Sequence, residues 1–272
     1  MLLAVGVADA AGPILVHGHR GARAARPENT LPAVEYAIGV GVDVLELDLQ
    51  VTRDNVLVVS HDATLSPVLC VGPNPGALIR QLTLAEVRQY DCGAKQNPAF
   101  PFQTPVAGTR VPTLDEVLAL APRGSFEFNI ETKISPLHPD YAPAPEEFAR
   151  LLLDAVRRHG LESRVIVQSF DFRTLHAMRK LAPGIRLSAL YQGEPKDFAQ
   201  VAREAASGIV SPNYHLVTPQ QVRAAHAAGL QVVPWTANRP ADWDALITAG
   251  VDAIITDDPA ALLAYLKARG LR

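Results

Sequence analysis

The feature that most constrains the fold is a regular alternation of amphipathic segments and short apolar runs in the second half of the chain. Glycines divide this half at intervals of 24, 24, 21 and 21 residues, at Gly160, Gly184, Gly208, Gly229 and Gly250. Each glycine closes a helical pattern and precedes a short β-branched or apolar run, which is typical of a helix C-terminus that leads into a strand. Each interval therefore has room for one strand and one helix.

Eight runs along the whole chain are predicted to be strands. They are Ile14–His17, Val44–Leu49, Phe126–Glu131, Val165–Gln168, Arg186–Leu190, Ile209–Ser211, Gln231–Trp235 and Ala253–Thr256. Helices are expected between them, among others at Thr30–Gly39, Leu114–Ala121 and Glu146–His159. Helix starts are indicated by the capping boxes Thr113-x-x-Glu116 and Thr218-Pro219-x-Gln221, and by Asp258-Pro259. Eight strand–helix units predict an α/β fold of the (β/α)8 or TIM-barrel type.

A doubly wound open sheet is the competing arrangement of alternating strands and helices. Such sheets usually have fewer strands and a glycine-rich first turn. Gly18-x-x-Gly21 is too short a match for a dinucleotide-binding turn. The barrel is therefore the favoured fold.

One long segment interrupts the alternation. From Ala63 to Pro112 there are 50 residues with 7 prolines and a single good helix start, Thr83-x-x-Glu86. The segment follows Val56–Ser60, which we interpret as a hairpin return from the second strand. Because long connections in compact domains are usually functional, we expect a lid or pocket wall here. The prediction is one barrel domain over residues 12–272 with an insertion at 63–112.

The first residues and the two cysteines bear on the compartment. Residues 1–11 form an N-terminal extension or the remnant of an export signal, since Ala8-Asp9-Ala10 fits a cleavage site but no basic residue precedes Arg20. Export would favour a disulfide between Cys70 and Cys92, whereas a cytoplasmic protein would keep two thiols. We expect a periplasmic or secreted protein, with a cytoplasmic one as the alternative.

Charge and hydropathy exclude several classes of partner. The net charge of −3 over 272 residues leaves no basic excess for nucleic acid, whose binding depends on clustered Lys and Arg. No apolar run reaches the roughly 20 residues that span a bilayer. The expected partner is a small molecule, without nucleic acid or an integral membrane segment, and the oligomeric state is left open.

The residues that carry chemistry stand at the predicted carboxyl ends of the first three strands, where barrel enzymes have their active sites. These ends contain His17-Gly18-His19-Arg20-Gly21, Glu46-Leu47-Asp48 with the hairpin return His61-Asp62, and Glu131-Thr132-Lys133. Since side chains alternate along a strand, Glu46 and Asp48 face one side, and Leu45, Leu47 and Leu49 face the helices.

Three carboxylates in one barrel mouth repel one another unless a cation is present. Ligands that are all oxygen suit Ca²⁺ or Mg²⁺ better than zinc, so Glu46, Asp48 and Glu131 are the predicted metal ligands. The alternative is that Glu46 or Asp48 pairs with an Arg or Lys across the barrel.

Two histidines and two cationic side chains complete a set suited to phosphodiester hydrolysis. Arg20 and Lys133 would neutralise the phosphate with the metal ion. Of the two histidines, His19 and His61, one can take a proton from the nucleophile while the other donates one to the leaving alkoxide. His17 is expected one layer deeper, as a hydrogen-bonded barrel residue. The remaining five are read as structural or surface residues: His138, His159, His176, His215 and His226.

Motifs along nearly the whole chain are similar to those of the glycerophosphodiester phosphodiesterase family. They are HRGARAARPENTLPA (19–33), ELDLQVTRDNVLVVSHD (46–62), ETK (131–133), Gln168-Ser169-Phe170, Trp235-Thr236-x-Asn238 and Thr256-Asp257-x-Pro259. The resemblance implies a (β/α)8 barrel with an insertion after the second strand. It also implies that His19 and His61 form the acid–base pair, and that Asn29 and Trp235 lie near the phosphate and the glycerol.

The resulting expectation is metal-dependent hydrolysis of glycerophosphodiesters to sn-glycerol 3-phosphate and an alcohol. The nearest alternative is a sphingomyelinase D or lysophospholipase D type of enzyme acting on lysolipids, which resembles this barrel but lacks the long insertion. A barrel that binds phosphodiesters without cleaving them is disfavoured, because every catalytic position of the family is occupied.

Overall fold

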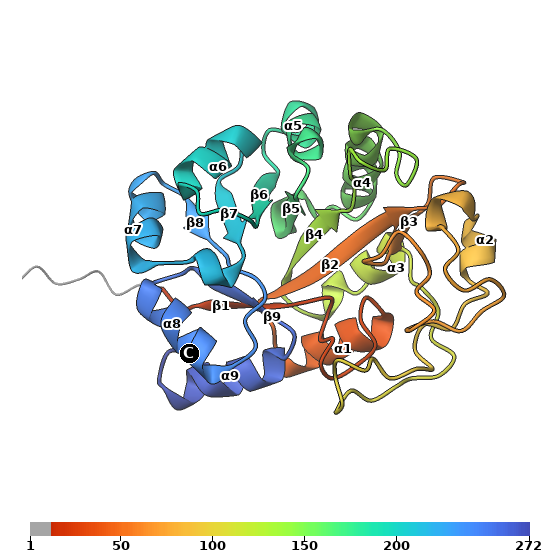
Figure 1. The fold of residues 1–272 in the computed structure, drawn as a ribbon, viewed down its shortest axis with the longest axis horizontal. Helices are drawn as coiled ribbons and strands as arrows, with labels where there is room; N and C mark the ends of the chain where they lie inside the picture. Colours follow the sequence, from red (N-terminus) through yellow and green to blue (C-terminus); the bar gives the residue numbers. More distant parts are fainter. Residues whose placement is uncertain (1–11) are drawn as a thin grey trace, which may run out of the picture.

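Parallel strands form the wall of the barrel in the computed structural model, which describes residues 12–272 (Figure 1). In the order of their hydrogen bonding they are β8 (Gln231–Val232), β7 (Ile209–Pro212), β6 (Arg186–Tyr191), β5 (Val165–Ser169), β4 (Glu127–Thr132), β2 (Val44–Val51), β1 (Leu15–Gly18) and β9 (Ala253–Thr256). Backbone bonds from Asp252 N to Val232 O and from Ile255 N to Pro234 O join the two ends of this series. The predicted barrel is confirmed. The predicted extension or signal remnant at 1–11 lies outside the described residues.

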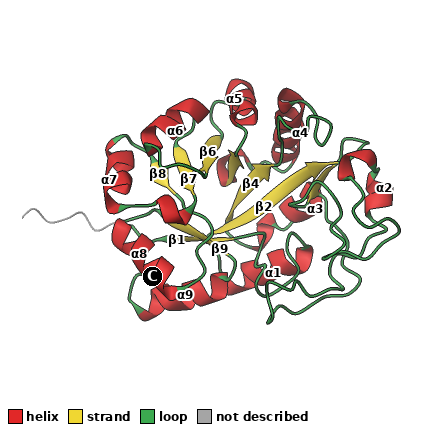
Figure 2. Ribbon diagram, viewed as in Figure 1, coloured by secondary structure: helices red, strands yellow, loops and turns green. Residues whose placement is uncertain are grey.

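Helices cover the outside of the strand wall (Figure 2). They are α1 (Leu31–Val40), α3 (Leu114–Leu118), α4 (Pro145–Arg158), α5 (Phe172–Leu181), α6 (Phe198–Ala205), α7 (Pro219–Ala227), α8 (Pro240–Ala249) and α9 (Pro259–Ala268). The capping box at Thr113 is present in full. At Thr218 only half of it forms: the Thr218 hydroxyl accepts from Gln221 N, but Gln221 Oε1 accepts from that hydroxyl and not from the Thr218 backbone N–H.

Two predicted boundaries are corrected by the structure. The helix expected at Leu114–Ala121 ends at Leu118 and is followed by a separate 3-10 turn over Ala121–Arg123, because Pro122 has no N–H to donate to Leu118 O. The expectation that a glycine ends each helix is confirmed at Gly250, which follows α8 with a φ of 82°. It does not hold for α6, which ends at Ala206 in the left-handed region, two residues before Gly208.

The two faces of β2 explain how the barrel is both stable and functional. Leu45, Leu47 and Leu49 are fully buried in the apolar layer under the helices, as predicted. The alternate residues face the barrel interior, where Glu46 and Asp48 are also buried. One strand therefore supplies core packing on one side and acidic groups on the other.

The insertion packs as a small unit with its own core. The strand β3 (Leu57–Val59) pairs antiparallel with β2, so the predicted hairpin return is confirmed. The short helix α2 (Leu84–Val87) starts at the predicted Thr83 capping box. Eight buried side chains form the second core: Val58, Leu65, Cys70, Ala77, Ile79, Val87, Tyr90 and Val111.

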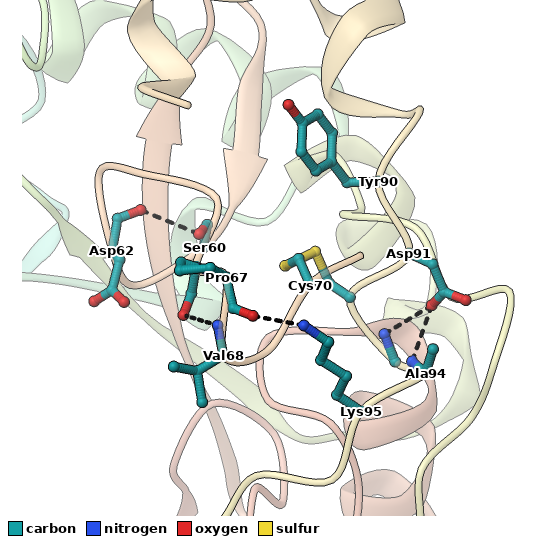
Figure 3. Close-up of a disulfide and its surroundings, with 12 residues drawn as sticks. Ser60, Asp62, Pro67, Val68, Cys70, Tyr90, Asp91, Ala94 and Lys95 are labelled. Carbon is teal, nitrogen blue, oxygen red and sulfur yellow. Dashed lines mark hydrogen bonds between the residues drawn. A yellow bond between two sulfur atoms is a disulfide. The ribbon is translucent and has the colours of Figure 1, made fainter. Parts of the chain in front are cut away.

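A disulfide joins Cys70 and Cys92 within the insertion (Figure 3). Beside it, Lys95 Nζ donates a hydrogen bond of 2.6 Å to Pro67 O. The insertion also rests on the loop between β1 and α1, where Thr104 N donates to Ala25 O at 3.0 Å. These ties fix the insertion beside the strand ends that carry the predicted site. No helix within residues 12–272 is long and apolar enough to cross a membrane.

Candidate active site

Three carboxylates meet at the carboxyl ends of β2 and β4. Glu46 and Asp48 lie on the inner face of β2, and the parallel register pairs Asp48 with Glu131 of β4. Oxygen atoms of the three side chains lie within 4.8 Å of one another, and all three residues are buried. We call Glu46, Asp48 and Glu131 the acidic triad.

Electrostatic repulsion within the acidic triad appears in its pKa values. Burial, reinforced by Asp48, raises the pKa of Glu46 well above its usual range. Burial also raises the pKa of Glu131 to about 7, even though Lys133 beside it acts in the opposite direction. Burial alone would raise the pKa of Asp48 too, but Lys133 and Arg20 hold it well below its usual value. A further positive charge among the three would favour their ionised forms.

The acidic triad fits a hard divalent cation. It offers only oxygen ligands, and the buried Asp48 Oδ1 accepts no aligned hydrogen bond from any residue of the 12–272 range. Glu46 is held from behind, since Arg20 N donates to its Oε2 at 2.9 Å and Gln168 Nε2 to its Oε1 at 2.8 Å. Hydrogen bonds of this kind orient metal ligands in proteins.

Arg20 and Lys133 lie against the acidic triad. Lys133 Nζ is 2.8 Å from Glu131 Oε1 and 3.0 Å from Asp48 Oδ1. Arg20 Nε is 3.2 Å from Asp48 Oδ2, while its Nη1 is 2.5 Å from Glu28 Oε1. The sequence left open whether Asp48 binds a metal ion or pairs with an Arg or Lys. In the structure Asp48 pairs with both Arg20 and Lys133 and also lies in the cluster of three carboxylates.

A tight turn after β1 places Arg20 and His19. Gly21 has a φ of 82°, and a Cβ there would come within 2.7 Å of the Ala33 backbone in α1, so only glycine fits. Arg20 is itself in the left-handed region, with a φ of 51°, which directs its backbone N–H at Glu46. The turn thus aims a main-chain donor and two side chains at the acidic triad.

His19 lies between Asp257 at the end of β9 and Glu46. Its Nδ1 is 2.5 Å from Asp257 Oδ1, and its Nε2 is 3.9 Å from Glu46 Oε2. Burial would raise the pKa of Asp257, but the hydrogen bond with His19 holds it below its usual value. Because the ionised carboxylate can only accept, Nδ1 donates and Nε2 is left free toward the cavity. Asn238 Nδ2 binds the other oxygen of Asp257 at 2.7 Å.

His61 follows β3 at the start of the insertion and is more exposed, at 36% of its side chain. Its Nδ1 is 2.7 Å from Asp62 Oδ1. The His61 backbone is tied to the barrel, since Gln50 Nε2 donates to its carbonyl oxygen at 3.1 Å. Both histidines therefore have a carboxylate at Nδ1 and Nε2 available.

Seven of the nine predicted site residues line one cavity of about 760 Å³, including its opening, at the carboxyl ends of the strands. Trp235 lies on its wall, with Nε1 donating to Ser211 O at 2.8 Å and the ring packed edge-on against Phe170. We call this space the phosphate cavity, after the prediction that Arg20 and Lys133 bind a phosphate. Its lining includes His19, Arg20, Glu46, His61, Glu131, Lys133 and Trp235.

Asn29 lies behind the acidic triad instead of on the cavity wall. Its Nδ2 donates to Asp48 Oδ2 at 2.9 Å, and its Oδ1 accepts from Asp48 N at 3.3 Å. Its backbone N donates to Arg20 O, so Asn29 supports the first loop, as its motif suggested. Its side chain is committed to Asp48 and borders a second cavity on the insertion side.

His17 is buried inside the barrel, one layer below His19. Burial lowers the pKa of His17 to about 3, so it is neutral. The hydrogen bond expected for it is missing at Nδ1, which has no partner among residues 12–272.

Sequence reasoning missed three residues that border the site. Asp257 belongs to the Thr256-Asp257-x-Pro259 motif, and its place at the end of the last strand, next to β1 in a closed barrel, is the available signal. Gln168 holds Glu46 and belongs to a quoted motif as well. Arg23 lines the phosphate cavity with its guanidinium 4.7 Å from the Phe100 ring of the insertion, a contact that no local pattern indicates.

Comparison with known proteins agrees with this geometry. A family model described as the glycerophosphoryl diester phosphodiesterase family matches residues 19–261. A glycerophosphodiester phosphodiesterase of Caldanaerobacter subterraneus subsp. tengcongensis is 35% identical over 94% of this chain and 99% of its own length.

Solved structures share the fold. A Silicibacter pomeroyi protein, whose assignment as a glycerophosphoryl diester phosphodiesterase is provisional, superposes with a TM-score of 0.89 at 32% identity over 95% of both chains. An Oleispira antarctica phosphodiesterase, solved with the product sn-glycerol-3-phosphate, gives a TM-score of 0.80 at 24% identity over 94% of this chain and 97% of its own.

Proposed function

This chain belongs to the glycerophosphoryl diester phosphodiesterase family, and we propose that it hydrolyses glycerophosphodiesters to sn-glycerol 3-phosphate and an alcohol with a histidine pair and a divalent cation. The observation that carries the proposal is the convergence of His19, His61, Glu46 and Glu131 on one cavity, with Asp48 next to the two glutamates. Within the proposal, Glu46, Asp48 and Glu131 hold Ca²⁺ or Mg²⁺, and Arg20 and Lys133 bind the phosphate.

The charge balance of the site supports a phosphodiester substrate. With all three carboxylates ionised, as a bound cation would favour, Arg20 and Lys133 leave one negative charge at the acidic triad. A divalent cation reverses the balance to one positive charge, which matches the single negative charge of a phosphodiester. The cation, when bound, supplies Lewis-acid stabilisation of the phosphoryl oxygens. With the carboxylates neutralised by the cation, Arg20 and Lys133 would pair less strongly with them and could bind the phosphoryl oxygens of the substrate.

The two histidines divide the proton transfers in this proposal. His19 presents Nε2 as an acceptor because Asp257 fixes the proton on Nδ1, so His19 is assigned as the base for the attacking hydroxyl. His61, on the insertion side of the cavity, is assigned as the acid that protonates the leaving oxygen. Asn29 acts through Asp48, and Trp235 forms the wall against the glycerol carbons.

Substitution of the histidines tests this assignment. His19→Ala and His61→Ala should each lower turnover of glycerophosphocholine by at least about 10³-fold, because proton transfer is lost on one side. EDTA should abolish activity, and Ca²⁺ or Mg²⁺ should restore it. His226→Ala is a matched control, since His226 pairs with Asp252 on the surface and should keep wild-type turnover. Full activity of His19→Ala would refute the acid–base pair.

A substrate comparison separates this function from a lysophospholipase D type of activity. The enzyme should release sn-glycerol 3-phosphate from glycerophosphocholine faster than it releases choline from lysophosphatidylcholine. A higher kcat/KM on the lysolipid would favour the alternative. Phosphorus NMR during the first turnovers would detect a cyclic phosphate, which forms only if the glycerol hydroxyl is the nucleophile.

We also propose a periplasmic or secreted location. The disulfide between Cys70 and Cys92 supports it, because such bonds persist in oxidising compartments. Labelling of free thiols in protein extracted under acid quench should find both cysteines unreactive, and two reactive thiols would contradict this location.

A further inference from the structure

A third cavity, distinct from the one that Asn29 borders, adjoins the phosphate cavity at His61. It encloses about 890 Å³ including its opening, and it shares His61, Glu131, Lys133 and Phe170 with the phosphate cavity. We call it the alcohol groove. The rest of its lining comes from two segments outside the regular barrel, the start of the insertion and the loop between β4 and α4: Asp62, Ala63, Thr64, Ile134, Ser135 and Tyr141.

The position of His61 decides which part of the substrate lies in the alcohol groove. His61 borders both cavities, and an acid that protonates the leaving oxygen must lie where that oxygen separates from phosphorus. Arg20, Glu46 and Trp235 line the phosphate cavity and not the groove, so the phosphate cavity takes the glycerol phosphate portion. The leaving alcohol then extends past His61 into the groove.

The alcohol groove offers an exposed carboxylate to a cation. Asp62 has 54% of its side chain exposed, and its second carboxylate oxygen is not used by His61. The hydrogen bond from His61 holds the pKa of Asp62 below its usual value. Among residues 12–272, Lys133 is the sole Lys or Arg on the lining, and its ammonium group is already paired with Asp48 and Glu131.

Aromatic rings provide the second element of cation recognition. His138 stacks on Tyr141 with ring centroids 4.6 Å apart and planes 13° apart, so one face of the Tyr141 ring is covered and its orientation is fixed. Phe170 is 40% exposed and is held at 89° to Trp235, with ring centroids 5.4 Å apart. A carboxylate together with aromatic rings is the usual environment for quaternary ammonium groups.

We propose that the alcohol groove is a leaving-group subsite that selects ammonium-bearing alcohols, with Asp62, Tyr141 and Phe170 as its specificity residues. The inference rests on the proposed glycerophosphodiesterase function and adds its substrate class. Choline and ethanolamine share the cationic chemistry. The primary ammonium of ethanolamine loses strong hydrogen bonds to water when it packs on an aromatic ring. The trimethylated ammonium of choline has no such hydrogen bonds to lose, so choline should be preferred.

The test compares kcat/KM for four diesters that differ only in the leaving alcohol. They are glycerophosphocholine, glycerophosphoethanolamine, glycerophosphoglycerol and glycerophosphoinositol. We expect glycerophosphocholine to exceed glycerophosphoglycerol by about tenfold, the size of a favourable contact between a cation and aromatic rings. The difference should lie mainly in KM, because the contact is made in the ground state as well.

Variants of Tyr141 separate the ring from the hydroxyl. Tyr141→Leu should reduce the ratio of choline to glycerol substrate by about fivefold or more, whereas Tyr141→Phe should keep it. Leu137→Ala is the matched control on the same loop, because Leu137 is 82% exposed and lies off the groove lining, and it should keep the wild-type ratio. Circular dichroism at matched concentration checks the fold of each variant.

The outcomes are distinguishable from failure of the proposed function. Equal kcat/KM for all four diesters, or a preference for inositol, would overturn the cation subsite while leaving the phosphodiesterase function intact. Hydrolysis of none of the four would refute the function itself. Tetramethylammonium gives a check that needs no variant, since it should inhibit wild-type turnover of glycerophosphocholine competitively, and absence of inhibition at 100 mM, on the order of the weakest useful affinity, would contradict the proposal.

Discussion

At the scale of single residues, Asp257 is the group on which His19 most depends. It accepts from His19 Nδ1 at 2.5 Å and is itself fixed by Asn238, whose Oδ1 accepts from Asp257 N at 2.9 Å. The chain therefore fixes both the ring and the carboxylate that orients it. An amide at position 257 could donate to Nδ1 and would favour the tautomer with the proton on Nε2, which cannot act as a base.

We therefore expect Asp257→Asn to lower kcat by about 10²- to 10³-fold with a small change in KM. Asp257→Glu should recover part of the loss, because it restores an acceptor. A purely structural role would lower the melting temperature without this pattern of rescue. Asp258→Asn is the matched control, since Asp258 caps α9 through Ala261 N and should affect stability but not kcat.

The site residues differ in how far the sequence alone could predict them. Glu46 and Asp48 share a face because side chains alternate along any strand, so local sequence is sufficient. Asp257 is 238 residues from His19, and their contact exists only because the barrel closes between β9 and β1. Arg23 meets Phe100 through the packing of the insertion, which follows no periodic pattern.

At the scale of elements, one carboxylate links α3 to the end of α4. Asp115 in α3 accepts from Arg158 at 2.8 and 2.9 Å, and from His159 Nε2 at 2.9 Å. Burial would raise the pKa of Asp115, but these donors hold it below its usual value. A carboxyl whose pKa is lower in the folded state stabilises the protein above the unfolded pKa of about 4, and this contribution is lost as the pH falls through the folded value.

Asp115→Asn should therefore lower the free energy of unfolding by about 1 kcal/mol at pH 7, a modest value because the pairs are partly exposed. The difference from wild type should shrink as the pH falls below about 4. Denaturant melts at pH 7, 5 and 3.5 measure it. Asp154→Asn removes only a surface pair with Arg150 and should have little effect at any of these pH values. A difference that persists at pH 3.5 would contradict the linkage.

Elements with strong local signals were predictable, and elements set by packing were not. Thr83 and Thr113 begin helices because their side chains satisfy backbone donors nearby. The strand expected at Gln231–Trp235 is regular only over β8, since Pro234 has no N–H to donate to the ladder. α6 ends at the exposed Ala206, which adopts the left-handed conformation two residues before Gly208, and no local pattern indicates this end.

At the scale of the whole molecule, closure of the barrel brings the acidic triad, Arg20 and Lys133 together at one end. The small net charge of −3 gives no sign of this local concentration of charged side chains. Eight similar strand–helix units were predictable because each carries its own pattern. The convergence of their polar ends is a property of the closed wall and of the insertion beside it. The acidic triad thus lies at one end of a stable barrel, where its repulsion lowers stability until a cation binds.

If a cation offsets the repulsion within the acidic triad, the cation and sn-glycerol 3-phosphate should each bind more tightly when the other is bound. Saturating Ca²⁺ or Mg²⁺ at about 100 times its dissociation constant adds about 2.7 kcal/mol of stability, which corresponds to a rise in melting temperature of roughly 5–10 °C relative to EDTA. Because Arg20 and Lys133 are paired with the acidic triad when no cation is bound, sn-glycerol 3-phosphate alone should give little shift in melting temperature. When the cation is present, sn-glycerol 3-phosphate should raise the melting temperature further.

Scanning fluorimetry with EDTA, cation, phosphate ester and both ligands measures the four states of this linkage. Asp48→Asn should remove the cation shift and with it the shift from the ester, since the two bindings share one charge balance. Asp244→Asn, a change at a surface pair with Arg269, should keep both shifts. An ester shift of equal size with and without the cation would show that Arg20 and Lys133 suffice to bind phosphate, and would remove the cation from substrate binding.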